Sequence, residues 1–187
     1  MKFIALILLT SLLTGCALKT DYVDIEYKPY FTPQRIVETG NVEVAISVND
    51  LRDKENVGDK VWESFNIMAN NDLSETFKNA IIWELQQRGF IIGQNGYDLN
   101  IEIYKLYNHF AQGGFTADAN SETVLNVTLR NREGIIAYSK TIIGYGDEKP
   151  CFNLSGKNAS LALERSLSQA VQKLMEDPNF IQALTNH

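Results

Sequence analysis

The chain has 187 residues, of which 44% are hydrophobic and 21% are charged, and its formal net charge is −6. This composition is ordinary for a globular protein and is sufficient for one domain with its own core. The acidic balance, with no cluster of Lys and Arg, argues against a nucleic-acid partner and against attachment to anionic membranes by charge alone.

Residues 1–16 have the layout of a bacterial export signal. A short basic start is followed by residues 3–13, which are apolar apart from Thr10 and Ser11. An apolar run of this length is too short to cross a bilayer, which takes about 20 helical residues. The run is therefore typical of the apolar region of a signal peptide.

The end of this stretch, Leu13-Thr14-Gly15-Cys16, resembles the lipobox of bacterial lipoproteins. The resemblance implies that residues 1–15 are removed as a signal peptide, that diacylglycerol is attached to the Cys16 thiol, and that a fatty acid such as palmitate acylates the new amino group. Ala17, in place of aspartate, implies sorting to the outer membrane with the domain facing the periplasm. Two or more acyl chains anchor a protein stably. The alternative is an ordinary signal peptide with an incidental cysteine.

The segment that follows, residues 16–40, is predicted to be a lipidated N-terminus with an extended tether. Pro29, Pro33 and the lack of a helical period favour extended chain, which reaches at most about 80 Å. The segment also carries several aromatic residues, which a purely flexible linker does not need. Part of it is therefore expected to lie against its own domain or against a partner.

The rest of the chain, residues 41–187, is predicted to form a single domain. Alternating or short apolar runs predict strands at residues 42–48, 61–67, 90–92, 97–110, 123–129 and 135–145. The alternation shifts around Tyr104, as a β-bulge would make it do. Residues 144–150, which begin with Gly-Tyr-Gly, are expected to end the sheet.

Helices are predicted in two regions of this domain. The first begins at a cap, Asp72 or its neighbour Asn71, ends before Gly89, and has an apolar stripe: Phe77, Ile81 and Leu85. The second covers residues 158–175, and Asp177-Pro178 then opens a short last helix. The predicted fold is α+β: a mostly antiparallel sheet, made of a first strand and then a three-stranded meander, packed on one face by two main helices plus the short C-terminal helix.

Groups able to perform catalysis are scarce. Neither of the two histidines, His109 and His187, stands in a metal-ligand pattern. The carboxylates of residues 50–59 are interleaved with Lys and Arg, which favours a solvated loop over a metal site. We therefore expect no metal, no cofactor and no enzymatic activity. A hydrolase that depends on Asp50 and Asp53 remains a minor alternative.

Two further features have a bland and a sharp interpretation. With Cys16 lipidated, Cys151 has no disulfide partner, so a buried thiol is favoured over a reactive or intermolecular one. Four aromatic residues near the predicted bulge pack in the core or line a ligand groove: Tyr104, Tyr107, Phe110 and Phe115.

The arrangement as a whole resembles the YajG family of uncharacterised bacterial outer-membrane lipoproteins. The matching features, besides the lipobox, are residues 44–53, the helix end and strand at 85–93, the strand at 99–103, and the terminal helices. The lipobox is the sharpest of these motifs. The resemblance implies no catalytic residues.

The leading hypothesis is a non-enzymatic lipoprotein, anchored through Cys16, whose domain binds an envelope protein as an accessory or assembly factor. The alternative is binding of a lipid, glycan or peptidoglycan-derived ligand in the aromatic groove, as in transport-auxiliary lipoproteins. The membrane, through the lipid anchor, is a partner in both cases.

Overall fold

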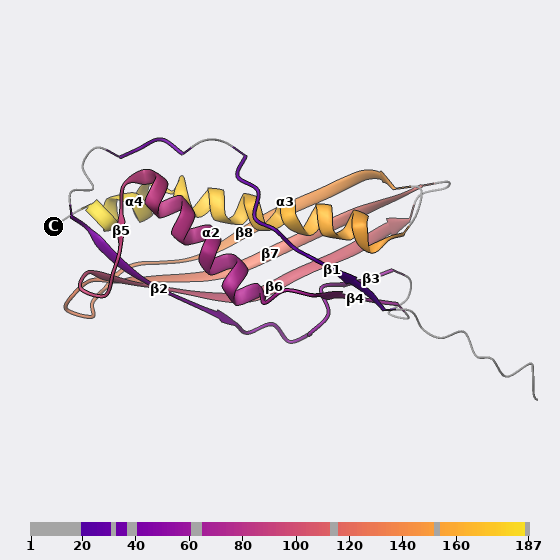
Figure 1. Ribbon diagram of the computed structural model, residues 1–187, viewed down its shortest axis with the longest axis horizontal. Coiled ribbons are helices and arrows are strands. Elements are labelled where there is room, and N and C mark those ends of the chain that lie inside the picture. The colour runs from indigo at the N-terminus through magenta and orange to yellow at the C-terminus, as the bar shows by residue number, and fades with distance from the viewer. Residues whose placement is uncertain are drawn as a thin grey trace, which may run out of the picture.

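A computed structural model describes residues 20–30, 33–36, 41–60, 65–112, 116–151 and 154–185. The described elements, in chain order, are β1 (Asp21–Val23), β2 (Glu43–Asp50), β3 (Gly58–Asp59), β4 (Asn66–Ala69), α2 (Leu73–Arg88), β5 (Ile91–Ile92), β6 (Tyr97–Gln112), β7 (Ala117–Arg130), β8 (Ile136–Cys151), α3 (Gly156–Met175) and α4 (Pro178–Thr185). The molecule is elongated along its long strands, and α3 runs beside them (Figure 1).

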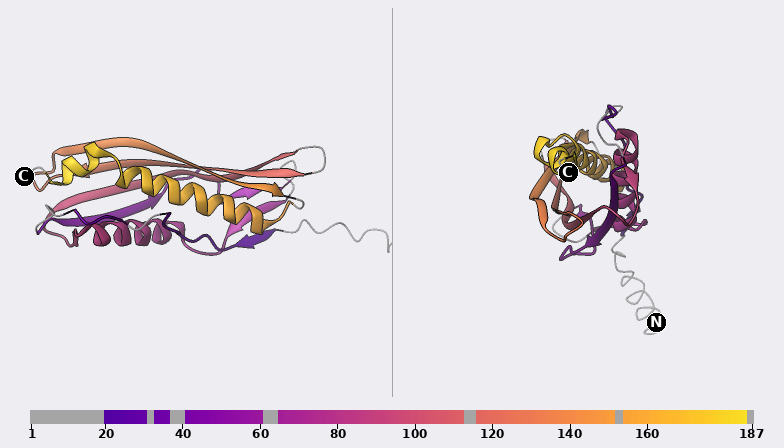
Figure 2. Two further views of the ribbon diagram at one scale, coloured as in Figure 1. Left: turned by 90° about the horizontal axis from the view of Figure 1, so that it is seen from above. Right: turned by 90° about the vertical axis from the view of Figure 1, so that its left-hand side faces the viewer.

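The strands form one mixed sheet. β2 lies between β5 and β6 and is parallel to both, with a register that runs from Val44 opposite Tyr97 to Asp50 opposite Ile103. β7 is antiparallel to β6, and β8 is antiparallel to β7. β1 is parallel to β4, and β3 is antiparallel to β4 but parallel to β6. The end-on view shows that the sheet is curled (Figure 2).

The prediction of a mostly antiparallel sheet with a three-stranded meander is therefore wrong. The first long strand, β2, joins the sheet parallel to β6 through the connection that contains α2 and β5. A parallel neighbour requires a crossover connection, and the helix supplies it. Alternation in a sequence reports which side chains face the core, but it does not report the direction of the neighbouring strand.

The boundaries of α2 agree with the predicted ones. The Asp72 side chain accepts a hydrogen bond from the Glu75 backbone N–H at 3.2 Å, and Gly89 ends the helix in the left-handed conformation with φ of 96°. Such a conformation is easy for glycine and costly for other residues. The predicted apolar stripe of the helix is fully buried: Phe77, Ile81 and Leu85.

Both main helices contribute to one hydrophobic core on the apolar face of the sheet. α3 packs directly on β8 at two glycines. A Cβ atom on Gly144 would lie 2.1 Å from the backbone oxygen of Ser166, and one on Gly146 would lie 2.1 Å from that of Ala162. The expectation that residues 144–150 end the sheet is also wrong, because β8 continues to Cys151. Gly144 and Gly146 therefore mark the close packing of α3 on β8, and not a turn at the end of the strand.

β8 is an edge strand, since β7 is its only neighbour in the described sheet. Side chains of α3 bind the backbone of this edge. Lys173 Nζ donates to the Ile143 oxygen at 2.8 Å, the Tyr145 N–H donates to Gln169 Oε1 at 2.9 Å, and Arg165 donates to the Asp147 oxygen. One helix therefore covers the core and closes part of the sheet edge.

The N-terminal segment, residues 20–30, is part of the folded body. β1 extends the sheet beside β4, and Val23 and Ile25 are buried. Asn71 holds Ile25 by both backbone groups, because it accepts from the N–H at 3.0 Å and donates to the oxygen at 2.8 Å. The segment then crosses the helices, where Lys28 binds α3 through Ser168 and Glu164. These residues lie against their own domain.

Candidate functional site

Several residues singled out in the sequence lie outside the described part of the chain. These are Cys16, Ala17, Phe115 and His187. Within the residues that the structure does describe, no helix combines the length and the apolarity that a membrane crossing requires.

The predicted β-bulge decides where the aromatic residues of β6 point. The pairing of β6 with β7 shifts between Ile103 and Lys105, so Tyr104 and Lys105 are both exposed and Tyr107 follows them on the outer face. Phe110 lies on the inner face and is only 5% exposed, so it belongs to the core. The structure thus brings Tyr104 and Tyr107 to one surface and separates Phe110 from them.

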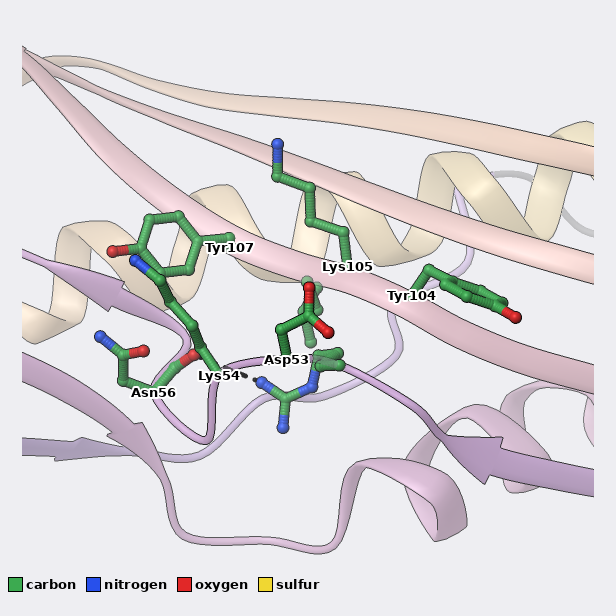
Figure 3. A pocket seen from close by; sticks show the side chains of 8 residues that line it. Asp53, Lys54, Asn56, Tyr104, Lys105 and Tyr107 are labelled. Carbon is green, nitrogen blue, oxygen red and sulfur yellow. Dashed lines mark hydrogen bonds between the residues drawn. The ribbon is translucent and has the colours of Figure 1, made fainter.

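Tyr104 and Tyr107 line an open pocket of about 350 Å³ (Figure 3). The loop after β2 supplies its other wall, through Arg52, Asp53, Lys54 and Asn56, and β6 adds Lys105 and Leu106. Its lining therefore combines three cationic side chains, one carboxylate, an amide and two phenol rings.

The loop is tied to the sheet at its base. Leu51 N–H donates to the Ile103 oxygen at 2.9 Å, next to the bulge. Arg52 binds the Asp50 carboxylate with two nitrogens, Nε at 2.9 Å and Nη2 at 2.8 Å. Asn56 donates to the Gly58 oxygen at 3.2 Å. A planar fork of this kind fixes the guanidinium, so its direction is set before any ligand arrives.

The opposite wall is held by Tyr107. Its hydroxyl donates to Asp59 Oδ2 at 2.7 Å, and Lys54 Nζ lies 5.3 Å from the centre of its ring. Figure 3 shows Lys54 beside this ring, with Tyr104 farther along the strand. Lys105 forms an ion pair with Glu122 on β7. An ammonium at this distance over a phenol ring is attracted by the ring electrons.

Such a pocket is suited to binding. Phenol rings stack on flat apolar or sugar faces, and Lys and Arg attract phosphate or carboxylate groups. The carboxylates weighed for a hydrolase are not paired with each other: Asp50 is bound by Arg52, and Asp53 is exposed. Among the described residues, no group of three or more His, Cys, Asp or Glu side chains is placed to hold a metal ion.

The described titratable groups with shifted pKa values lie outside the pocket: burial raises the pKa of Tyr30, and the others belong to two polar networks. Tyr27 donates to Glu84, which also pairs with Arg88, and burial together with the Glu84 carboxylate raises the pKa of Tyr27. Tyr138 donates to Asp177 at 3.0 Å, and burial and this carboxylate raise the pKa of Tyr138. Both networks tie distant segments together.

The remaining sequence candidates are in plain structural settings. His109 is exposed on β6. Cys151 is buried, and its Sγ lies 3.1 Å from the Glu148 oxygen. A buried thiol at the end of a strand agrees with the favoured interpretation of this residue.

Sequence reasoning missed the contribution of the loop to the pocket. Arg52 and Lys54 are predicted from the sequence only as parts of a solvated, charged loop, yet together with Asn56 they line the pocket with Tyr104 and Tyr107 of β6. The sequence shows a charged loop after β2 and a bulge in β6, but it does not show that these two segments are neighbours. The parallel register of β2 and β6 places the loop beside the bulge.

Residues 29–185 match the model of a protein family described as uncharacterised lipoprotein. The chain belongs to this family of lipoproteins. The matched residues include β2 to β8, the three described helices and the residues that line the pocket. A search of curated proteins found no match.

Solved structures of similar shape come from several bacteria. A hypothetical protein from Chlamydia trachomatis is 8% identical, with a TM-score of 0.48, over 79% of this chain and 100% of that one. A minor lipoprotein from Acinetobacter baumannii is 6% identical, with a TM-score of 0.46, over 82% of this chain and 95% of that one. A neuraminyllactose-binding hemagglutinin homolog from Helicobacter pylori is 8% identical, with a TM-score of 0.48, over 87% of this chain and 98% of that one.

Proposed function

We propose that this protein is a non-enzymatic lipoprotein of the outer membrane whose domain faces the periplasm and binds another envelope component as an accessory or assembly factor. The observation that carries the proposal is the lipoprotein family match of residues 29–185, downstream of the lipobox that ends at Cys16. The resemblance of the sequence to YajG proteins, together with Ala17 after the cysteine, supports the outer membrane as the location.

The proposal assigns a role to each part of the chain. Residues 1–15 are a signal peptide that is removed, residues 16–40 begin with the lipidated cysteine and already pack against the domain over residues 20–30, and residues 41–187 form the rest of the periplasmic domain. Cys16 carries the acyl chains, and Ala17 directs the protein to the outer membrane. Two or more acyl chains hold a protein at a membrane stably.

Metabolic labelling with an alkyne fatty acid tests the anchor. Wild-type protein is expected to incorporate the label and to sediment with outer-membrane vesicles, whereas Cys16→Ser is expected to lose the label and to keep its signal peptide. Cys151→Ser is the matched control, because it removes the other cysteine and leaves labelling unchanged. Ala17→Asp is expected to move the labelled protein to the inner membrane. Label retained by Cys16→Ser would refute the anchor.

Crosslinking in intact cells tests the partner. Affinity purification after envelope crosslinking is expected to recover the same protein repeatedly from wild-type cells and not from cells with Cys16→Ser. The absence of any reproducible partner over repeated purifications would count against an accessory role.

A second candidate function is binding of a glycan or peptidoglycan-derived ligand with an anionic group in the pocket between the β2–β3 loop and β6. It is favoured by the joint placement of two phenol rings with Arg52, Lys54 and Lys105 around one cavity. Phenol rings bind sugar faces, and the cations bind carboxylate or phosphate.

Calorimetry with purified muropeptides and detergent-solubilised protein tests this second function. Combined Lys54→Ala and Tyr104→Ala changes are expected to weaken binding at least tenfold, the equivalent of about 1.4 kcal/mol. Tyr145→Ala is the matched control, because this tyrosine is 56% exposed on β8 and lies outside the pocket. Equal affinity in all three proteins would exclude the pocket as the site.

A further inference from the structure

The point at which the chain joins the folded body is fixed. Asp21, the first residue of β1, accepts a hydrogen bond from the Gly156 N–H at 2.9 Å and forms an ion pair with Lys60. β1 also pairs with β4 along its whole length. This point lies at the end of the molecule that carries β1, β3 and β4, which we call the β1 end (Figure 1).

The opposite end is far away. It carries β5, α4 and the turn between β7 and β8, and we call it the α4 end (Figure 1). β6 runs between the two ends with 16 residues, which corresponds to about 53 Å at the rise of an extended strand. One end of the molecule can therefore lie at the lipid headgroups while the other end is well outside them.

The chain between the lipid and the body is short. Asp21 follows Cys16 by only five residues, which span at most about 18 Å whatever their conformation. The tether predicted from the sequence reached about 80 Å because it ran to residue 40, but the body already begins at β1. An anchor on Cys16 thus holds the β1 end close to the bilayer and gives the α4 end no such constraint.

The chemistry of the surface at the β1 end agrees with this placement. Tyr22 is 66% exposed, and it lies opposite the half-buried Met68 in the pairing of β1 with β4. Tyrosine is enriched at the level of lipid headgroups, because its ring is apolar and its hydroxyl is polar.

The charge of the molecule gives its long faces no attraction to an anionic bilayer, although Tyr104 on β6 and Ile143 and Tyr145 on β8 are exposed there. Loss of residues 1–15 removes Lys2 and no acidic residue, which takes the formal charge from −6 to −7. The outer face of the central strands carries short polar side chains that bind one another: Ser47 donates to Asn100 at 2.9 Å, and Thr141 donates to Asn126 at 2.6 Å. An acidic body is not drawn flat onto an anionic surface by charge.

We propose that the β1 end of this domain lies against the lipid surface and that its long axis points away from the bilayer, so that the α4 end stands about 50 Å above the headgroups. The proposal rests on lipidation of Cys16 in the proposed function. In this orientation, the turn between β7 and β8 is presented to other envelope proteins about 50 Å from the membrane surface.

Energy transfer to labelled lipids tests the orientation in the full-length, lipidated protein. A donor dye is attached to a single new cysteine, at Asp24 near β1 or at Arg132 in the β7–β8 turn, both of which are exposed. Cys151 is replaced by serine, or kept if that variant does not fold, since its thiol is 2% exposed and resists labelling. The protein is placed in vesicles of phosphatidylethanolamine and phosphatidylglycerol with an acceptor on the outer headgroups.

The donor at position 24 is expected to be quenched several-fold more than the donor at position 132. Equal quenching means that the molecule lies flat, and stronger quenching at position 132 means that it is inverted; either result overturns the proposal. Insertion of a long Gly-Ser linker between Lys19 and Thr20 is expected to lower the quenching at position 24, because the short connection sets the position. No change on insertion would also contradict the proposal.

Flotation of the same vesicles separates the two levels of the argument. If wild-type protein and Cys16→Ser float equally, the proposed anchor fails. If only wild-type protein floats but both donors are quenched equally, the anchor holds and the orientation alone is refuted.

Discussion

Gly144 of β8 lies directly against Ser166 of α3, so that a Cβ atom at position 144 would stand 2.1 Å from the Ser166 backbone oxygen and 2.6 Å from the Ala170 nitrogen. The obstruction is backbone, which cannot rotate aside as a side chain can. The helix reaches the strand at this distance only because the strand has no side chain there. The packing of α3 on β8 therefore depends on glycine at this position.

Gly144→Ala is therefore expected to destabilise the fold by about 3 kcal/mol or more, through displacement of α3 from β8. Urea unfolding monitored by circular dichroism measures the loss. Gly134→Ala is the comparison, because position 134 has open space around it but a φ of 79°, and its cost is expected near 1 kcal/mol. A smaller effect at position 144 than at position 134 would contradict the packing argument.

Arg88→Met is expected to destabilise the protein by about 3–5 kcal/mol, because it leaves the buried carboxylate of Glu84 without its cation. The two residues form an ion pair on α2, and Tyr27 donates to the same carboxylate. The additional change Glu84→Gln is expected to recover part of the loss, since the amide oxygen still accepts from Tyr27. Chemical denaturation of both single variants and the double variant measures the coupling, and simple additivity would show that the pair does not act as a unit.

Asp177 gives the fold a dependence on acid. Burial alone raises its pKa, but hydrogen bonds from Lys140 at 2.7 Å, from Tyr138 and from the Asn179 backbone, with the charge of Lys140, lower it below the usual value. A carboxyl whose pKa is lower in the folded state stabilises the fold above its unfolded pKa of about 3.9, and this stabilisation is lost as pH falls through the folded value.

Asp177→Asn is therefore expected to be less stable than wild type at pH 7 and to approach wild type near pH 3. Thermal unfolding over this pH range measures the difference. Asparagine has a single acceptor oxygen, so it can keep the bond from the Asn179 N–H on Oδ1 but loses the Oδ2 acceptor that Tyr138 and Lys140 use. The change of the difference with pH, and not its size at pH 7, therefore reports the charge. A stability difference that is the same at pH 7 and pH 3 would exclude the carboxylate as its cause.

Asn108 destabilises the fold through an amide that is unpaired and buried in the described part of the chain. It is fully buried on the inner face of β6, and neither polar atom of its side chain has a hydrogen-bond partner among the described residues. Because an unpaired buried amide costs about 1–3 kcal/mol, Asn108→Leu, which keeps the branching of the side chain, is expected to stabilise the fold by about 1 kcal/mol. A lower urea midpoint for this variant would show that the amide is satisfied in solution.

Local signals in the sequence were sufficient for some of the fold. Asp72 and Gly89 mark the two ends of α2 as predicted, because helix capping depends on a few neighbouring residues. The bulge near Tyr104 was visible as a shift in alternation. In each case, the physical cause lies within one turn of helix or one stretch of strand, so no knowledge of distant residues was needed.

The errors have a common physical origin in contacts between distant segments. The parallel direction of β2 is set by its partner β6, about 50 residues away, and by the helix between them. Gly144 looked like the end of a strand because glycine is common in turns, but its role depends on α3. The pocket likewise required the loop after β2 to face β6, which alternation within either segment could not reveal.

The side chains of α3 that bind the edge of β8 have a further consequence under the proposed lipid anchor. Anchored molecules diffuse in two dimensions, so their domains meet one another more often than free ones do. A bare strand edge would then pair with the same edge of a neighbour, and the result would be sheet extension between molecules. Lys173, Gln169 and Arg165 occupy backbone groups that such pairing requires. The helix therefore disfavours edge-to-edge pairing of two copies along residues 143–147 of β8.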